Sequence, residues 1–197
     1  MLLPANLLGI FFALASSVSW GGGDFSGGFA TRRAHQYHVL AASSLSGMFV
    51  LLLCALIWRE SIPSTSSLIY AAAAGVIGAF GLAALYRALS LDAAATIAST
   101  SGVIGAAIPV LFSAWVVGMP GGLQIAGFIL SFAGIWLVSR SLAAKTKISQ
   151  QGFILACLAG FCFGAFFILI AQVDSGQVFL PLIVSRFISF LVALLLI

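Results

Sequence analysis

Seven apolar segments follow one another through this chain of 197 residues, and each is near the length that crosses a lipid bilayer. A membrane-spanning helix needs about 20 apolar residues. Only 6% of the residues are charged and 62% are hydrophobic, whereas a soluble domain carries about 25% charged residues. We therefore expect an all-α, polytopic transmembrane helix bundle. The expected spans are residues 6–30, 37–58, 66–87, 92–117, 122–140, 150–172 and 178–197.

Two stretches of the chain resemble each other. Residues 9–21 align without gaps on residues 152–164, so that Gly9 matches Gly152 and Gly21 matches Gly164. Because the copies lie in the first and the sixth expected spans, and successive spans alternate in direction, they should run in opposite directions. An inverted repeat in a membrane protein indicates a transporter with its site between the two halves.

The repeat also predicts the domain organisation. We expect residues 1–147 to form one five-helix repeat and residues 148–197 to begin a second, truncated one. Three further spans would then follow Ile197, giving ten in all.

The basic residues predict an orientation. One face of the expected bundle collects six basic residues and the other collects only Arg59. The six are Arg32, Arg33, Arg87, Arg140, Lys145 and Lys147. By the positive-inside rule, the amino terminus would lie outside and these residues in the cytoplasm of a cell with the protein in its inner (plasma) membrane.

Several other classes of protein are disfavoured. The basic residues lie at span ends and form no patch, so we expect no nucleic-acid partner. Cys54, Cys157 and Cys162 lie in apolar segments with no metal-binding spacing, so we expect no metal and no cofactor. A signal peptide cleaved after Ala15 is the alternative for the first segment, but this segment lacks a basic start and its apolar run continues to Ala30.

Small residues at intervals of four predict close helix packing, which replaces the hydrophobic effect as the cause of helix association in lipid. The third span presents such a stripe, as do the fourth and fifth. The stripes are Ala71, Gly75, Ala79 and Ala83; Ala98, Gly102 and Ala106, with Ser101 and Gly105 alongside; and Gly127 and Ser131.

Glycines predict helix breaks at matching places in the two copies. Gly21, Gly22 and Gly23 open a run with five glycines in eight residues, and Gly164 lies at the matching place. Unwound backbone within a membrane is tolerated only where protein or a water-filled cavity satisfies it, so these positions indicate a transport site. The alternative is that the glycines serve close packing. Pro109 predicts a kink in the fourth span.

Two ionisable residues lie within expected spans, where charge is expensive. Asp24 is about two turns from the end of its span and could exchange protons, bind a cation or pair with an arginine. Alternatively, the first span ends near Asp24 and leaves it at the interface. Arg186 is about nine residues into the last span, so it needs either Asp24 as a structural partner or a substrate carboxylate.

Polar and aromatic residues supply further candidates for substrate binding or gating. Thr96, Ser99 and Thr100 would line a cavity or bond back to their own helix. The aromatic candidates Trp20, Phe163 and Phe166 would stack on a substrate or pack in the core. Tyr86, with Arg87, would anchor the third span at the lipid headgroups or contact substrate.

The chain resembles the EamA-like group of the drug/metabolite transporter (DMT) superfamily. The resemblance rests on four stretches in order: Ser19-Trp20-Gly21 with Phe25; residues 85–89; residues 108–112 followed by 127–137; and residues 181–187. It implies ten helices in two inverted repeats, a central cavity, alternating access and export of amino acids, other metabolites or drugs. Gly118-Met119-Pro120 replaces the Gly-Glu-Arg turn of the family, so no role is carried over from that glutamate. The family is also usually drawn with the amino terminus inside, and the orientation stays open.

The sequence therefore predicts a permease, not an enzyme, for a small organic metabolite. Its partners would be the lipid bilayer and the substrate, with a coupling proton or cation and a homodimer left open. A non-transporting scaffold or assembly factor is the alternative. An intramembrane enzyme would need paired carboxylates, a Ser/His pair or a metal set within the spans, and the sequence offers none.

Overall fold

The computed structural model describes residues 5–143 and 149–197 of the chain, and these form seven helices. The helices are α1 (Ala5–Thr31), α2 (Gln36–Trp58), α3 (Thr65–Leu91), α4 (Ala94–Val116), α5 (Gly122–Ala143), α6 (Gln150–Ile170) and α7 (Phe179–Leu195). The expected all-helical bundle is confirmed. Lys145 and Lys147 lie outside the described residues, as does the expected repeat boundary between residues 147 and 148.

Four of the described helices, α2, α3, α4 and α6, are long and apolar enough to cross a membrane. The apolar part of α5 over Gly122–Ile135 and the whole of α7 are shorter. Large apolar side chains such as Phe49, Leu130 and Phe161 point outward, as expected for a bundle whose solvent is lipid. Membrane crossing by α1, α5 and α7 stays a prediction.

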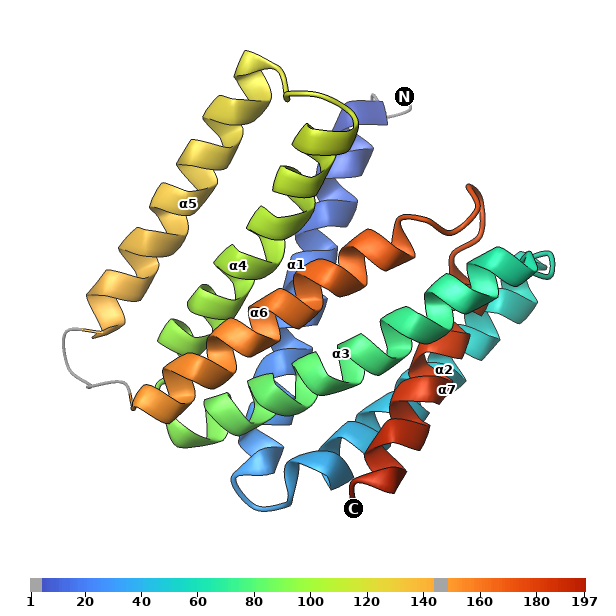
Figure 1. The fold of residues 1–197 in the computed structure, drawn as a ribbon, viewed down its shortest axis with the longest axis horizontal. Helices are drawn as coiled ribbons and strands as arrows, with labels where there is room; N and C mark the ends of the chain where they lie inside the picture. Colours follow the sequence, from blue (N-terminus) through green and yellow to red (C-terminus); the bar gives the residue numbers. More distant parts are fainter. Residues whose placement is uncertain (1–4, 144–148) are drawn as a thin grey trace.

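Helix α3 is the centre of the bundle, with α6 and α7 packed along it (Figure 1). The predicted stripe from Ala71 to Ala83 is buried throughout. A Cβ on Gly75 would lie 2.5 Å from the carbonyl oxygen of Ser185 in α7. The Ser189 hydroxyl in α7 donates to the carbonyl oxygen of Gly75 at 2.8 Å. The missing side chain at Gly75 therefore lets the backbones of α3 and α7 approach.

The stripes predicted for α4 and α5 are only partly right. On α4 the packed positions are Ser101 and Gly105, which face α6, whereas Ala98, Gly102 and Ala106 are exposed. On α5 both stripe residues are exposed, and α5 lies at the edge of the bundle beside α4 (Figure 1). Several faces of each helix carry small residues, so spacing alone does not select the packed one.

The expected breaks at glycine are not found. Helix α1 runs without interruption through Gly21, Gly22 and Gly23, and α6 runs through Gly164. A glycine costs a helix only about 1 kcal/mol relative to alanine, while an unpaired backbone group in lipid costs several, so the helix is kept. Helix α4 also continues through Pro109, and the kink expected there stays a prediction.

Candidate functional site

The four acidic residues of the chain have two kinds of surroundings. Glu60, Asp92 and Asp174 lie outside the helices or at their ends, and each accepts hydrogen bonds at the beginning of another helix. Asp24 is the exception, since it lies within α1 and is half-buried. It is therefore the acid that the bundle leaves available for another role.

Two loop carboxylates join the α2–α3 and α6–α7 connections at one end of the bundle. Glu60 accepts backbone hydrogen bonds from Val178, Phe179 and Leu180 at the first turn of α7. Although burial opposes ionisation, these three bonds hold the pKa of Glu60 below its ordinary value. The interaction fixes where α7 begins, and therefore the height of Arg186 in the bundle.

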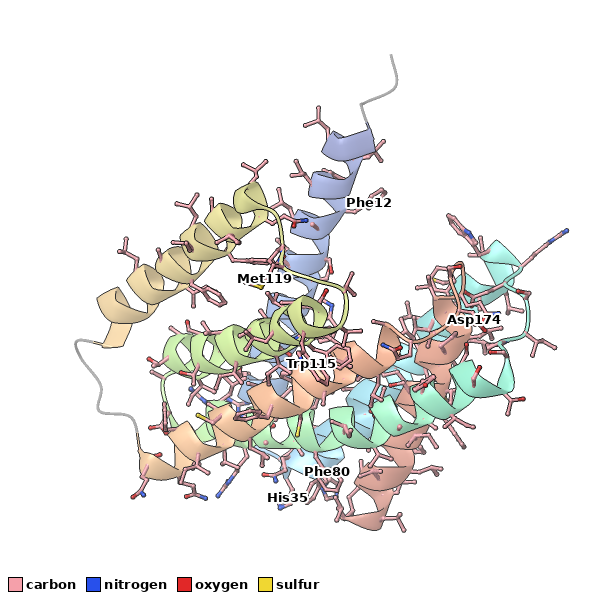
Figure 2. The ribbon with its side chains drawn as sticks, turned by 45° about the horizontal axis from the view of Figure 1, so that its top comes forward. Phe12, His35, Phe80, Trp115, Met119 and Asp174 are labelled. Carbon is pink, nitrogen blue, oxygen red and sulfur yellow. The ribbon has the colours of Figure 1, made fainter. Side chains whose placement is uncertain are left out.

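Asp174 makes the companion interaction beside the α2–α3 connection (Figure 2). Its carboxylate accepts from the Ser64 hydroxyl at 2.5 Å and from the Ser67 hydroxyl at 2.8 Å. The hydrogen bond from Ser64, followed by that from Ser67, lowers the pKa of Asp174. Because Ser64 is the N-cap of α3, the α6–α7 connection is tied to the start of the central helix.

Asp24, Tyr86 and Arg186 come together from α1, α3 and α7. Arg186 interacts electrostatically with Asp24, and both interact with Tyr86. Tyr86 is only 3% exposed and belongs to the buried core. The prediction that it anchors α3 at the headgroups is therefore wrong, and Arg87, which is exposed, is the residue at the surface. Together with Ser43 of α2, these three residues form the polar cluster.

Helix α2 completes the polar cluster through Ser43 and Gly47. The side chain of Ser43 lies near the phenol of Tyr86. A Cβ on Gly47 would lie 3.6 Å from Nε of Arg186, so the guanidinium group passes close to the α2 backbone. Next to Ser43, the hydroxyl of Ser44 is buried without a hydrogen-bond partner in the described structure. A polar interior thus extends from α1 across α3 and α7 to α2.

The two charges of the cluster are near each other but not joined. Within the described part of the chain, no nitrogen of Arg186 lies within 4.0 Å of a carboxylate oxygen. The structural Asp24–Arg186 ion pair considered from the sequence is therefore not formed in this structure. Charges held inside a bundle without direct pairing are expensive, and a ligand that bridged them would lower this cost.

Glycines of α1 create the room for Tyr86. Gly27 lies against the side chain of Tyr86, and a Cβ there would overlap the phenol. A Cβ on Gly28 would lie 2.6 Å from Cβ of Leu89. The packing explanation therefore holds for the last glycines of the run. At Gly21, Gly22 and Gly23, by contrast, an added Cβ would meet no neighbouring heavy atom within 4 Å.

The three hydroxyl candidates on α4 differ in whether they have a hydrogen-bond partner. Ser99 donates to the carbonyl oxygen of Ala95 at 2.6 Å, and Thr100 donates to that of Thr96 at 2.8 Å. Both bond back to their own helix. The Thr96 hydroxyl is buried and has no partner in the described structure, so it is the one of the three that still has an unmet donor.

The three aromatic candidates differ in how closely they are packed. Phe163 packs against Gly81 and Gly105, and Phe166 packs against Gly78, so these two rings fill space between α6 and its neighbours. Trp20 is 43% exposed, and its ring centroid lies 6.4 Å from that of Phe167. The sequence thus groups three aromatics that the tertiary structure places in different surroundings.

Ser43, Ser44 and Gly47 were missed by reasoning from the sequence. A weak signal existed, because small and polar residues interrupt the otherwise apolar span of α2 at this depth. The sequence does not reveal that this face of α2 meets Tyr86 and Arg186. Within the described residues, no three His, Cys, Asp or Glu side chains gather where they could hold a metal ion.

Comparison with known proteins supplies the family. The model of the EamA-like transporter family, which belongs to the DMT superfamily, matches residues 7–140. No curated protein and no solved structure matches the chain. The matched region extends from the start of α1 nearly to the end of α5 and includes Asp24, Ser43 and Tyr86. Because it covers well over half of the sequence, the chain belongs to the EamA-like transporter family, whose members are membrane transporters.

Proposed function

We propose that this protein is a permease that exports a small organic metabolite, such as an amino acid, a related metabolite or a drug. It would do so by alternating access between two inverted repeats in the inner (plasma) membrane. The observation that carries the proposal is the polar cluster, in which Asp24 and Arg186 lie inside the bundle without a direct ion pair.

The arrangement supports three roles. Arg186 would bind an anionic group of the substrate, and Tyr86, with Ser43 beside it, would position that group. Asp24 would bind a cationic group or carry a coupling proton or cation. Trp20, which is partly exposed on the same helix as Asp24, would contact the apolar part of the substrate.

Alternating access is supported by the two matching helices. Helices α1 and α6 cross the bundle in opposite senses (Figure 1). A site between two units of opposite orientation can be exposed to either side by rocking one unit against the other. The polar cluster draws on α1, α2 and α3 from one expected repeat and on α7 from the other.

The test is transport of radiolabelled amino acids and cationic drugs in proteoliposomes with the purified protein. We expect Arg186→Gln and Asp24→Asn each to reduce flux at least about ten-fold, since an ionic contact with substrate contributes about 1.5–3 kcal/mol. Arg59→Asn is the matched control because it also removes a charge, at the exposed end of α2. Asparagine is chosen because it tolerates the left-handed backbone that Arg59 adopts.

Unchanged flux in both cluster variants would overturn these roles. A non-transporting scaffold, the alternative function, predicts no flux of any solute with the wild-type protein. Thermal unfolding of each variant in detergent separates a lost site from a lost fold.

A further inference from the structure

A hollow of about 700 Å³ lies at the end of the bundle where α1 and α3 end and α4 begins. Thr31 at the end of α1 and Arg32 in the turn that follows line one side of it. Arg87 and Ser90 line it from α3, and Asp92 and Ala93 line it from the turn before α4. None of these residues belongs to the polar cluster.

The two arginines of the hollow carry unneutralised charge. Arg32 and Arg87 are both exposed, and neither has a carboxylate within 4.0 Å in the described part of the chain. The neighbouring Arg33 differs, because its guanidinium carbon lies 5.7 Å from the centroid of the Phe29 ring. Two cations of the hollow are therefore available to one anionic ligand.

The carboxylate of Asp92 is occupied elsewhere. The Ser149 backbone N–H donates to its Oδ1 at 3.1 Å, and the Ser149 hydroxyl donates to its Oδ2 at 2.5 Å. Ser149 is the N-cap of α6, so the acid compensates the positive end of that helix dipole. Its negative charge is thus directed at α6.

The beginning of α4 adds positive potential to the hollow. Ala93 is the N-cap of α4 and has no side chain that could accept from the first-turn N–H groups. An uncapped helix N-terminus favours an anion. The hydroxyls of Ser90 and Thr31 already donate to backbone carbonyls, so the attraction for an anion comes from the two arginines and α4.

We propose that this hollow binds a phosphate group. Arginine forks are donors that phosphate oxygens prefer, and the positive end of the α4 dipole adds to the attraction. The hollow lies at an end of a membrane bundle, where basic pockets between helices meet lipid headgroups. An anionic lipid and a soluble phosphate would present the same chemistry.

The experiment measures binding to the purified protein in detergent by thermal-shift titration. The probes are phosphatidylglycerol and, separately, inorganic phosphate at constant ionic strength. We expect Arg32→Gln and Arg87→Gln each to weaken binding about ten-fold, as expected for the loss of one hydrogen-bonded contact between a charged side chain and the phosphate. Arg33→Gln and Arg59→Asn are the controls and should bind as the wild type does.

The two probes distinguish the sources of the phosphate group. Arginine-dependent binding of phosphatidylglycerol alone supports a lipid site, and arginine-dependent binding of inorganic phosphate supports a site for a free phosphate. Equal weakening in the controls, or no binding of either probe by the wild type, would overturn the proposal. Arg32→Lys and Arg87→Lys keep the charge and should retain most of the binding, and unfolding without ligand checks that each variant is folded.

Discussion

Helices α1 and α6 carry the same pattern of small residues but have opposite surroundings. On α6 the stripe Gly152, Ala156, Gly160 and Gly164 is buried. A Cβ on Gly160 would lie 2.8 Å from the carbonyl oxygen of Ser101 in α4, and one on Gly164 would lie 2.6 Å from Cβ of Ile108. The aligned stripe on α1, Gly9, Ala13, Ser17 and Gly21, is exposed throughout.

The difference shows that a small-residue stripe permits close packing without choosing a partner. Helix α6 lies between α3 and α4, and its small residues let both helices pack closely against it. Helix α1 packs against α3 near its carboxyl end, at Gly27 and Gly28. Its amino-terminal half, which carries Phe12, stands clear of the other helices (Figure 2).

The aligned aromatics follow the same division. Phe163 on α6 packs against two core clusters, while the matching Trp20 on α1 is 43% exposed. The packed Phe163 is held by its neighbours, whereas the partly exposed Trp20 is free to contact a mobile ligand. This is why Trp20 remains a candidate for substrate contact and Phe163 is better explained by packing.

The test with the largest expected effect on stability replaces the aligned Gly164 and Gly21 with valine. Gly164→Val should destabilise the protein by about 1–3 kcal/mol, because the added atoms collide with Ile108 across a packed interface. Gly21→Val has the same intrinsic effect on helix formation but no neighbour within 4 Å, so it should change stability by about 0.5 kcal/mol or less. Unfolding in mixed micelles measures both variants. An equal loss for Gly21→Val would contradict the difference between the two helices.

A second, smaller test separates the two halves of α1. Gly28→Ala should destabilise by about 1 kcal/mol, since its Cβ would overlap Leu89. Gly22→Ala should leave stability unchanged or raise it by up to about 1 kcal/mol, because alanine favours helix and nothing lies close to this position. The same unfolding measurement gives both values. Effects of the same sign would show that the open half of α1 is packed after all.

The smallest expected effect concerns the hydrogen bonds of Asp174 and Glu60, which hold the connection between α6 and α7. The pKa values of Asp174 and Glu60 are lowered from ordinary values of 3.8 and 4.5. Their contribution to stability is therefore complete above these values and is lost as pH falls through the lowered pKa values. The melting temperature of the wild type should fall more steeply below about pH 5 than that of Asp174→Asn or Glu60→Gln. Parallel curves for all three proteins would contradict these interactions.

Much of the fold could be predicted from the sequence. The seven helices begin and end within a few residues of the expected spans, because apolar length and polar connectors are local properties. Asp24 and Arg186 could be singled out because a charge within an apolar segment is conspicuous. The buried stripe of α3 was also predicted correctly, since most of the surface of that helix is covered by neighbours.

The tertiary structure alone decided which faces meet. It buries Tyr86, brings Ser43 and Gly47 of α2 to Tyr86 and Arg186, and leaves the stripe of α1 open. The physical reason is that lipid tails are as apolar as a helix surface, so hydrophobicity cannot mark the side of a helix that will face protein. Sequence determined the helices and their charges, while the fit between backbones determined the site.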